Sequence, residues 1–245
     1  MNKSSRKVSG KAIIRTVLSV ILVAVIGFVL YVNDFYHANP SALAVLDEVE
    51  GVELLEKKGQ YVFVPDTATA GLIFYPGGKV EVESYIPLMA RFAEQGVLCV
   101  LMEMPGNLAV LDIHAADGVT EEYPEVERWY MGGHSLGGAM AASYTAKHAE
   151  EFEGLLLLAT YSTEDLSDTD LEVLAVFGSE DKVLDQDAFE ENITNLPAGY
   201  HVEVLTGGNH AQFGDYGAQK GDGEAFVSRE EQMKRTAELF AEMLK

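Results

Sequence analysis

The feature that most constrains the fold is an alternation of short apolar runs with helical patterns over residues 60–245. Several runs contain no polar residue, which is typical of parallel strands covered on both faces. The runs lie at residues 61–64, 71–75, 97–102, 128–131, 155–159, 171–177 and 201–205. The helical patterns lie at residues 82–94, 136–150, 187–195 and 228–244. This alternation predicts an α/β fold with a mostly parallel sheet flanked by helices.

A separate apolar stretch precedes this region. Residues 12–32 are apolar except for Arg15, Thr16 and Ser19, and a helix of that length spans about 31 Å, close to the thickness of a bilayer's hydrocarbon core. Basic residues come before the stretch and acidic residues after it. The positive-inside rule therefore predicts a transmembrane helix with a cytoplasmic N-terminus and the remainder of the chain outside.

A stretch of this kind has two other interpretations. A buried core helix is disfavoured because the apolar residues occupy all faces. A cleaved signal peptide is conceivable, with Ala42-Leu43-Ala44 as the cleavage pattern, but that site lies far beyond the apolar run. We expect a retained anchor in residues 1–33, a connector and N-terminal part in residues 34–59, in which Ser41 caps a helix over residues 42–46, and an α/β domain in residues 60–245.

Charge argues against nucleic acid as a partner. The chain has 39 acidic and 17 basic residues, and five of the basic ones lie in the first fifteen positions, where no acid occurs. The remainder thus carries 12 basic against 39 acidic residues, a net charge of −27 that phosphate backbones would repel. The only cysteine, Cys99, lies in an apolar run and is expected to be a small buried side chain.

The strongest chemical motif is Gly-His-Ser-Leu-Gly at residues 133–137, between an apolar run and a helical pattern. A serine at a tight strand-to-helix turn has a strained backbone that exposes its hydroxyl. Glycine two residues away on each side avoids collision with the neighbouring strand or helix. The motif predicts that Ser135 is a nucleophile. Of the three later histidines, His148 lies in a helical pattern and His201 begins an apolar run. Only His210 follows a run, beside two glycines, so it is the candidate base.

At this point residues 60–245 resemble the α/β-hydrolase family, whose acid and histidine follow the serine in sequence. Gly-Gly-Asn-His at residues 207–210 is similar to the histidine loop of small bacterial members. Gly-Ser-Glu-Asp at residues 178–181 resembles the acid loop, which implies Asp181 as the orienting acid, with Glu180, Asp185 and Asp187 nearby.

The resemblance also implies backbone donors for an oxyanion. One is the amide of Leu136, and the other is the amide of Gly78 or Lys79 in the loop after residues 71–75. Residues 160–170 are too few for a lid domain, so we expect an open site. No cofactor or metal is expected.

The resemblance implies a serine hydrolase, a carboxylesterase or lipase-like enzyme acting on a small-molecule ester. The alternatives are an acyltransferase or peptidase using the same triad, or a non-catalytic exported binding domain.

Overall fold

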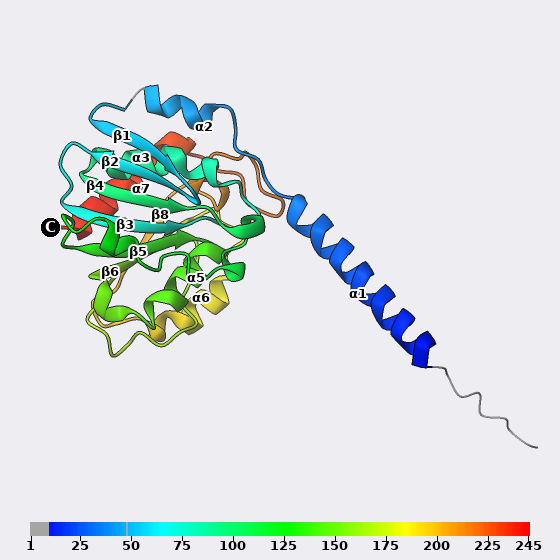
Figure 1. Ribbon diagram of the computed structural model, residues 1–245. Coiled ribbons are helices and arrows are strands. Elements are labelled where there is room, and N and C mark those ends of the chain that lie inside the picture. Colours follow the sequence, from blue (N-terminus) through cyan, green and yellow to red (C-terminus); the bar gives the residue numbers. More distant parts are fainter. Residues whose placement is uncertain (1–9, 48) are drawn as a thin grey trace, which may run out of the picture. The chain divides into compact units, whose positions relative to one another are not determined.

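The computed structural model describes residues 10–47 and 49–245, and the chain divides into two compact units, Met1–Asp34 and Phe35–Lys245. The first unit contains helix α1 (Gly10–Asn33) (Figure 1). The large apolar side chains of α1 are exposed. Within the described residues, α1 is the one helix that is long and apolar enough to cross a membrane, judged by length and composition.

The second unit is built on a single sheet in which the order of the strands is β1-β2-β4-β3-β5-β6-β7-β8. The strands are β1 (Val52–Lys57), β2 (Gln60–Pro65), β3 (Ala70–Tyr75), β4 (Val97–Met102), β5 (Trp129–His134), β6 (Gly154–Leu158), β7 (Glu172–Gly178) and β8 (His201–Leu205). Strands β3 to β8 run parallel, whereas β2 pairs antiparallel with β1 and β4. The prediction of a mostly parallel sheet flanked by helices is confirmed.

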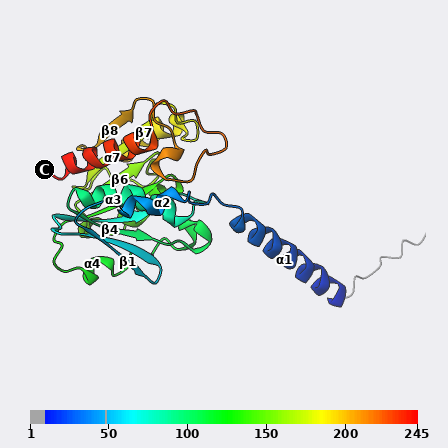
Figure 2. The same ribbon diagram turned by 90° about the horizontal axis from the view of Figure 1, so that it is seen from above.

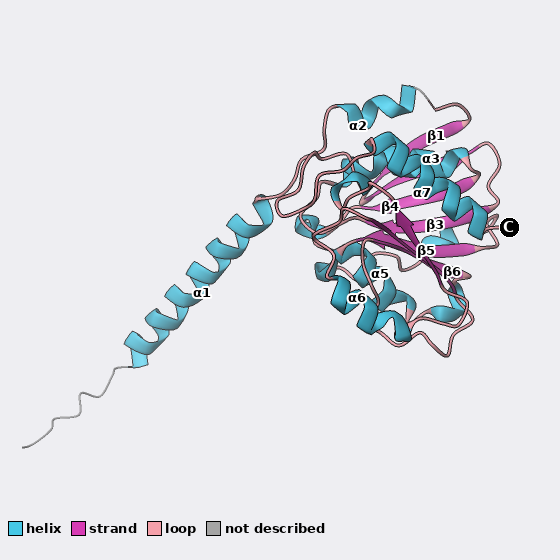
Figure 3. Cartoon of the chain, turned by 180° about the vertical axis from the view of Figure 1, so that it is seen from behind, coloured by secondary structure: helices cyan, strands magenta, loops and turns pink. Residues whose placement is uncertain are grey.

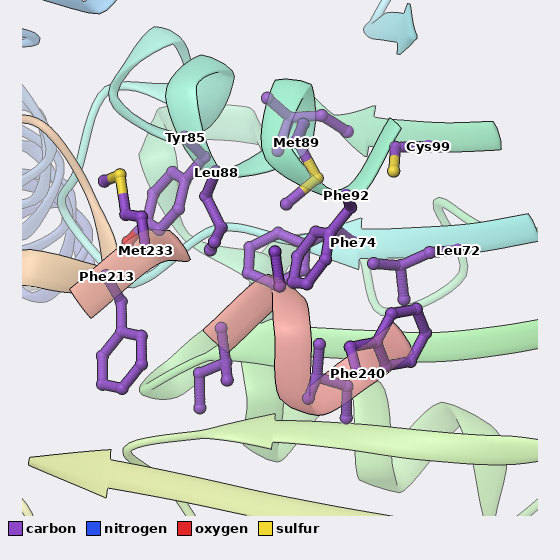
Figure 4. Close-up of a cluster of buried hydrophobic side chains, with 14 of the residues drawn as sticks. Leu72, Phe74, Tyr85, Leu88, Met89, Phe92, Cys99, Phe213, Met233 and Phe240 are labelled. Carbon is purple, nitrogen blue, oxygen red and sulfur yellow. The ribbon is translucent and has the colours of Figure 1, made fainter. Parts of the chain in front are cut away.

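Helices cover both faces of the sheet. They are α2 (Ser41–Ala44), α3 (Ile86–Glu94), α4 (Val119–Glu122), α5 (Leu136–Thr145), α6 (Gln186–Asn192) and α7 (Arg229–Met243). Helices α3 and α7 pack together on one face (Figure 2), where Phe92 and Phe240 meet edge to face within a large apolar cluster (Figure 4). Helices α5 and α6 lie on the other face (Figure 3). They contribute to a second apolar cluster that includes Met131, Ala141 and Phe189.

Three local predictions were wrong. Strand β1 was missed because three of its six residues are charged, and it forms by pairing with β2 across a turn at Lys58-Gly59. The helix after Ser135 ends at Thr145, not at residue 150. Ser41 does not cap a helix, because α2 starts at Ser41 itself, with Pro40 at the cap position, and the Ser41 hydroxyl donates to Asp215 instead.

The sheet topology brings several loops to one edge. Strands β3, β5, β7 and β8 are parallel, so the loops that follow them leave the sheet at their common carboxyl ends. These loops hold the predicted donors, nucleophile, acid and base, in the place where ligand sites of open α/β sheets form. Residues 159–171, all of them described, contain no helix or strand, so no folded lid is inserted there.

Candidate active site

Ser135 occupies a strained turn between β5 and α5. Its φ of 53° and ψ of −125° are unfavourable for a residue with a Cβ, as expected of a nucleophile turn. A Cβ on Gly133 would lie 2.7 Å from the Tyr75 carbonyl oxygen, and one on Gly137 would overlap the Pro76 carbonyl. The two glycines therefore let β5 and α5 approach the loop after β3, while the half-buried Ser135 remains accessible.

His210 and Asp181 form a buried pair. The distance from His210 Nδ1 to Asp181 Oδ2 is 2.9 Å, and both side chains are almost fully buried. The other carboxylate oxygen of Asp181 accepts the amides of Val183 and Leu184, each at 2.8 Å. These bonds fix the carboxylate. The carboxylate in turn orients the imidazole through Nδ1, which leaves Nε2 available for proton transfer.

A close approach of two loops produces this pair. The Glu180 amide donates to the Gly208 carbonyl at 2.8 Å, and a Cβ on Gly178 would overlap the backbone of Gly208. The acid loop after β7 and the histidine loop after β8 thus touch along their backbones. Glu180 itself points elsewhere, since its carboxylate accepts a hydrogen bond from Ser179.

The imidazole of His210 lies beside the nucleophile turn. Its ring centroid is 4.5 Å from that of His134, the residue immediately before Ser135. Within the described residues, no hydrogen bond joins the Ser135 hydroxyl to His210; such bonds often tighten only when a substrate is bound. Of the other histidines, His201 begins β8 and is exposed, and His148 follows α5 and stacks on Tyr144.

Two of the three predicted oxyanion donors have free amides. The Lys79 amide donates to the Asn107 carbonyl at 2.7 Å, so it is not available. The Gly78 amide has no acceptor among the described residues, and the Leu136 amide is the first of α5. A Cβ on Gly78 would lie 2.8 Å from Leu136 Cδ2, which shows that these two positions adjoin. The structure thereby selects Gly78 over Lys79 as the free donor.

Sequence reasoning did not identify two residues beneath this site. The hydroxyl of Tyr85 accepts the Gly77 amide at 3.0 Å and lies 2.8 Å from His134 Nδ1. It thus links the loop after β3 to the strand that carries Ser135. Burial, helped by the neighbouring His210, lowers the pKa of His134 well below its ordinary value, so its ring is neutral. Burial also raises the pKa of Tyr85, so its hydroxyl stays protonated. No local sequence pattern distinguishes Tyr85 from an ordinary core aromatic.

Acidic residues near His210 hold the loop. Asp222 accepts the amides of His210, Ala211 and Gly223. Asp215 is 1% exposed and forms an ion pair with Arg229. In the described part of the chain, no three His, Cys, Asp or Glu side chains gather in a way that could hold a metal ion.

Comparisons with known proteins agree with this architecture. No curated protein matches the chain. Among solved structures, dienelactone hydrolase from Anabaena variabilis has a TM-score of 0.60 at 13% identity, covering 79% of this chain and 97% of its own. Est1E from Butyrivibrio proteoclasticus has a TM-score of 0.57 at 15% identity, covering 80% and 99%. A predicted CIB-like hydrolase from Thermoplasma acidophilum has a TM-score of 0.55 at 17% identity, covering 78% and 97%.

At these identities the likeness to solved structures is one of fold. Family membership rests on the sequence: residues 71–234, more than half of the chain, match the alpha/beta hydrolase family. The matched region begins in β3 and ends within α7, so it contains the nucleophile turn, the acid loop and the histidine loop. The chain belongs to the α/β-hydrolase family.

Proposed function

We propose that this protein is a serine hydrolase that cleaves carboxylic esters through an acyl-enzyme, with Ser135 as nucleophile, His210 as base and Asp181 as orienting acid. The observation that carries the proposal is the buried His210–Asp181 hydrogen bond of 2.9 Å, formed next to a serine in a strained turn. A carboxylate that fixes one imidazole nitrogen leaves the other nitrogen free to accept a proton from a hydroxyl.

The reaction follows from these positions. Ser135 Oγ attacks the ester carbonyl carbon while its proton passes to His210 Nε2, and Asp181 stabilises the charged imidazole. The amides of Gly78 and Leu136 donate to the oxyanion of the tetrahedral intermediate. The intermediate collapses, the alkoxide leaves with the proton from Nε2, and Ser135 remains acylated. A water molecule, deprotonated by Nε2, then attacks the acyl carbon. The second intermediate collapses by breaking its bond to Ser135 Oγ, which takes the proton back from Nε2 as the carboxylic acid leaves.

The test is hydrolysis of p-nitrophenyl esters of increasing acyl length by the full chain in detergent. We expect turnover to disappear in Ser135→Ala and to persist in the control Ser167→Ala, which changes an exposed serine whose hydroxyl donates to Asp165. A fluorophosphonate probe should label the wild type and not Ser135→Ala. Equal activity in Ser135→Ala would refute the nucleophile, and a folded wild type with neither labelling nor turnover would favour the binding domain. Adding a competing alcohol separates hydrolysis from acyl transfer by the products formed.

For localisation, we propose that α1 is retained as a single membrane anchor with the catalytic domain outside the cytoplasm. The support is the apolar length of α1 together with the basic residues that precede it and the acidic residues that follow. We expect a protease added to intact cells to degrade the domain while leaving cytoplasmic proteins untouched. Protection of the domain from that protease would contradict this topology.

A further inference from the structure

The chain that leads into the catalytic unit is paired with the loop that carries the proposed oxyanion donor. We define residues 35–41 as the junction segment. The Tyr36 amide donates to the Lys79 carbonyl at 2.8 Å, and the Glu81 amide donates to the Tyr36 carbonyl at 2.9 Å, so that Tyr36 and Val80 form a parallel bridge. The Ala38 amide also donates to the Glu81 carboxylate at 2.8 Å. The first bonded residue, Lys79, directly follows Gly78.

The same segment is bonded to the far end of the histidine loop. The Asn39 amide donates to the Asp215 carbonyl at 2.8 Å, and the Asn39 side chain donates to Asp215 Oδ1 at 2.6 Å. The Ser41 hydroxyl donates to Asp215 Oδ2 at 2.7 Å. Asp215 is buried and comes five residues after His210. The aromatic rings of Tyr36 and Tyr216 also lie 5.5 Å apart.

The junction segment therefore connects the two loops on which the proposed chemistry depends. One loop supplies the Gly78 amide and the other supplies His210, and the two are more than one hundred residues apart in sequence. An oxyanion donor should lie about 2.7–3.1 Å from the position of the oxyanion, so small shifts in this loop matter. Without the segment, the buried Asp215 would lose the donors on both carboxylate oxygens that come from Asn39 and Ser41.

We propose that Tyr36, Asn39 and Ser41 are positioning residues of the active site, and that only protein retaining the junction segment is active. The inference rests on the proposed function. Cleavage of the chain after Ala44 would remove the whole junction segment and yield an inactive domain. Release of the domain from α1 by such a cut would switch the enzyme off, whereas a cut before Phe35 would not.

The first experiment compares two proline variants of the full chain in detergent. Tyr36→Pro removes the amide bonded to Lys79, and His37→Pro is the matched control because the His37 amide has no acceptor among the described residues. We expect Tyr36→Pro to lower the kcat for p-nitrophenyl esters at least tenfold with KM within about twofold, since the oxyanion donor acts in the transition state. His37→Pro should retain wild-type kcat. Equal kcat in Tyr36→Pro and the wild type would overturn the inference.

The double variant Asn39→Ala with Ser41→Ala tests the contact between the junction segment and the histidine loop. It also tests the positioning role of the junction segment if Tyr36→Pro does not fold. We expect its kcat to fall at least fivefold and its fluorophosphonate labelling to slow in proportion. A folded double variant with kcat within twofold of the wild type would refute the positioning role. Loss of turnover in Ser135→Ala remains the separate test of the proposed function, so the two failures are distinguishable.

The processing consequence is tested on the protein as cells make it. Membrane and culture fractions are labelled with the fluorophosphonate probe, and the intact masses of the labelled species give their N-termini. We expect every labelled species to contain residues 35–41. A labelled species that begins at Val45 would overturn the inference.

Discussion

Deleting one buried hydroxyl tests the network beneath the proposed site. Tyr85 is fully buried in the apolar cluster of Figure 4, and its ring lies 5.6 Å from that of Phe74. Tyr85→Phe keeps this packing and removes only the oxygen that accepts from the Gly77 amide and is hydrogen-bonded to His134 Nδ1. Gly77 and His134 are both buried, so neither can form a replacement hydrogen bond with water.

The expected cost follows from those two groups. A buried polar group left without a partner costs about 1–3 kcal/mol, so two of them lower the free energy of unfolding by about 2–6 kcal/mol. For a chain of this size that corresponds to a drop in Tm of roughly 4–24 °C. The loss is a large part of the total stability of about 5–15 kcal/mol of an ordinary domain.

The assay is urea unfolding followed by the fluorescence of Trp129, the only tryptophan, which is buried in β5. The control is Tyr61→Phe, which deletes a hydroxyl bonded to Glu83 at 2.8 Å. Both Tyr61 and Glu83 are half-buried, so water can replace this bond and the cost should stay within about 1 kcal/mol. If Tyr85→Phe loses no more stability than Tyr61→Phe, the network does not support the loop as argued.

Three further predictions concern the acid, the turn and pH. Asp181→Asn should lower the kcat for p-nitrophenyl esters by about 10⁴-fold, which is the effect of the same change in a well-studied Ser-His-Asp protease. The control Glu180→Gln should change kcat only slightly. Similar losses of kcat in both variants would reject Asp181 as the orienting acid. Gly137→Ala places a Cβ against backbone that cannot move aside, so it should cost about 3 kcal/mol or more in urea unfolding, against about 0.5 kcal/mol or less for Gly199→Ala, where the space is open. Burial lowers the pKa of His134, so below pH 6.5 the unfolded chain binds a proton at this residue that the folded chain does not bind. The contribution of His134 to the free energy of unfolding is therefore present above pH 6.5 and is lost as the pH falls below that value, by about 1.4 kcal/mol per pH unit. His134→Gln should remove that contribution to the slope of unfolding free energy against pH between 6.5 and 5, and an unchanged slope would show that His134 is not buried in its neutral form.

Several elements could be predicted because their signals are local. Uninterrupted apolar runs such as residues 97–102 mark strands buried on both faces. All seven predicted runs lie within strands or overlap them, including the run in β8, which is mostly exposed. The glycines at 133 and 137 reveal the nucleophile turn because the backbone of the loop after β3 packs tightly against both positions. The pairing of His210 with Asp181 was expected from the resemblance to the α/β-hydrolase family, which places each in a loop after a strand, and the parallel order of β7 and β8 brings those loops together.

Other features depend on which distant segments meet. Strand β1 exists because β2 is beside it, and its own charged residues give little sign of a strand. The choice between Gly78 and Lys79 was decided by Asn107, whose carbonyl takes the Lys79 amide. Tyr85 resembles any core aromatic until its hydroxyl is seen between Gly77 and His134.

The sequence by itself determined the fold class, the apolar N-terminal helix and the candidates Ser135, Asp181 and His210. These follow from residue types within a few positions of one another, which set local backbone geometry and burial. Only the tertiary structure decided which amide is free, what orients the histidine loop, and that the junction segment is bonded to both loops. Hydrogen bonds between remote segments depend on the order of strands in the sheet, and no local pattern contains that order.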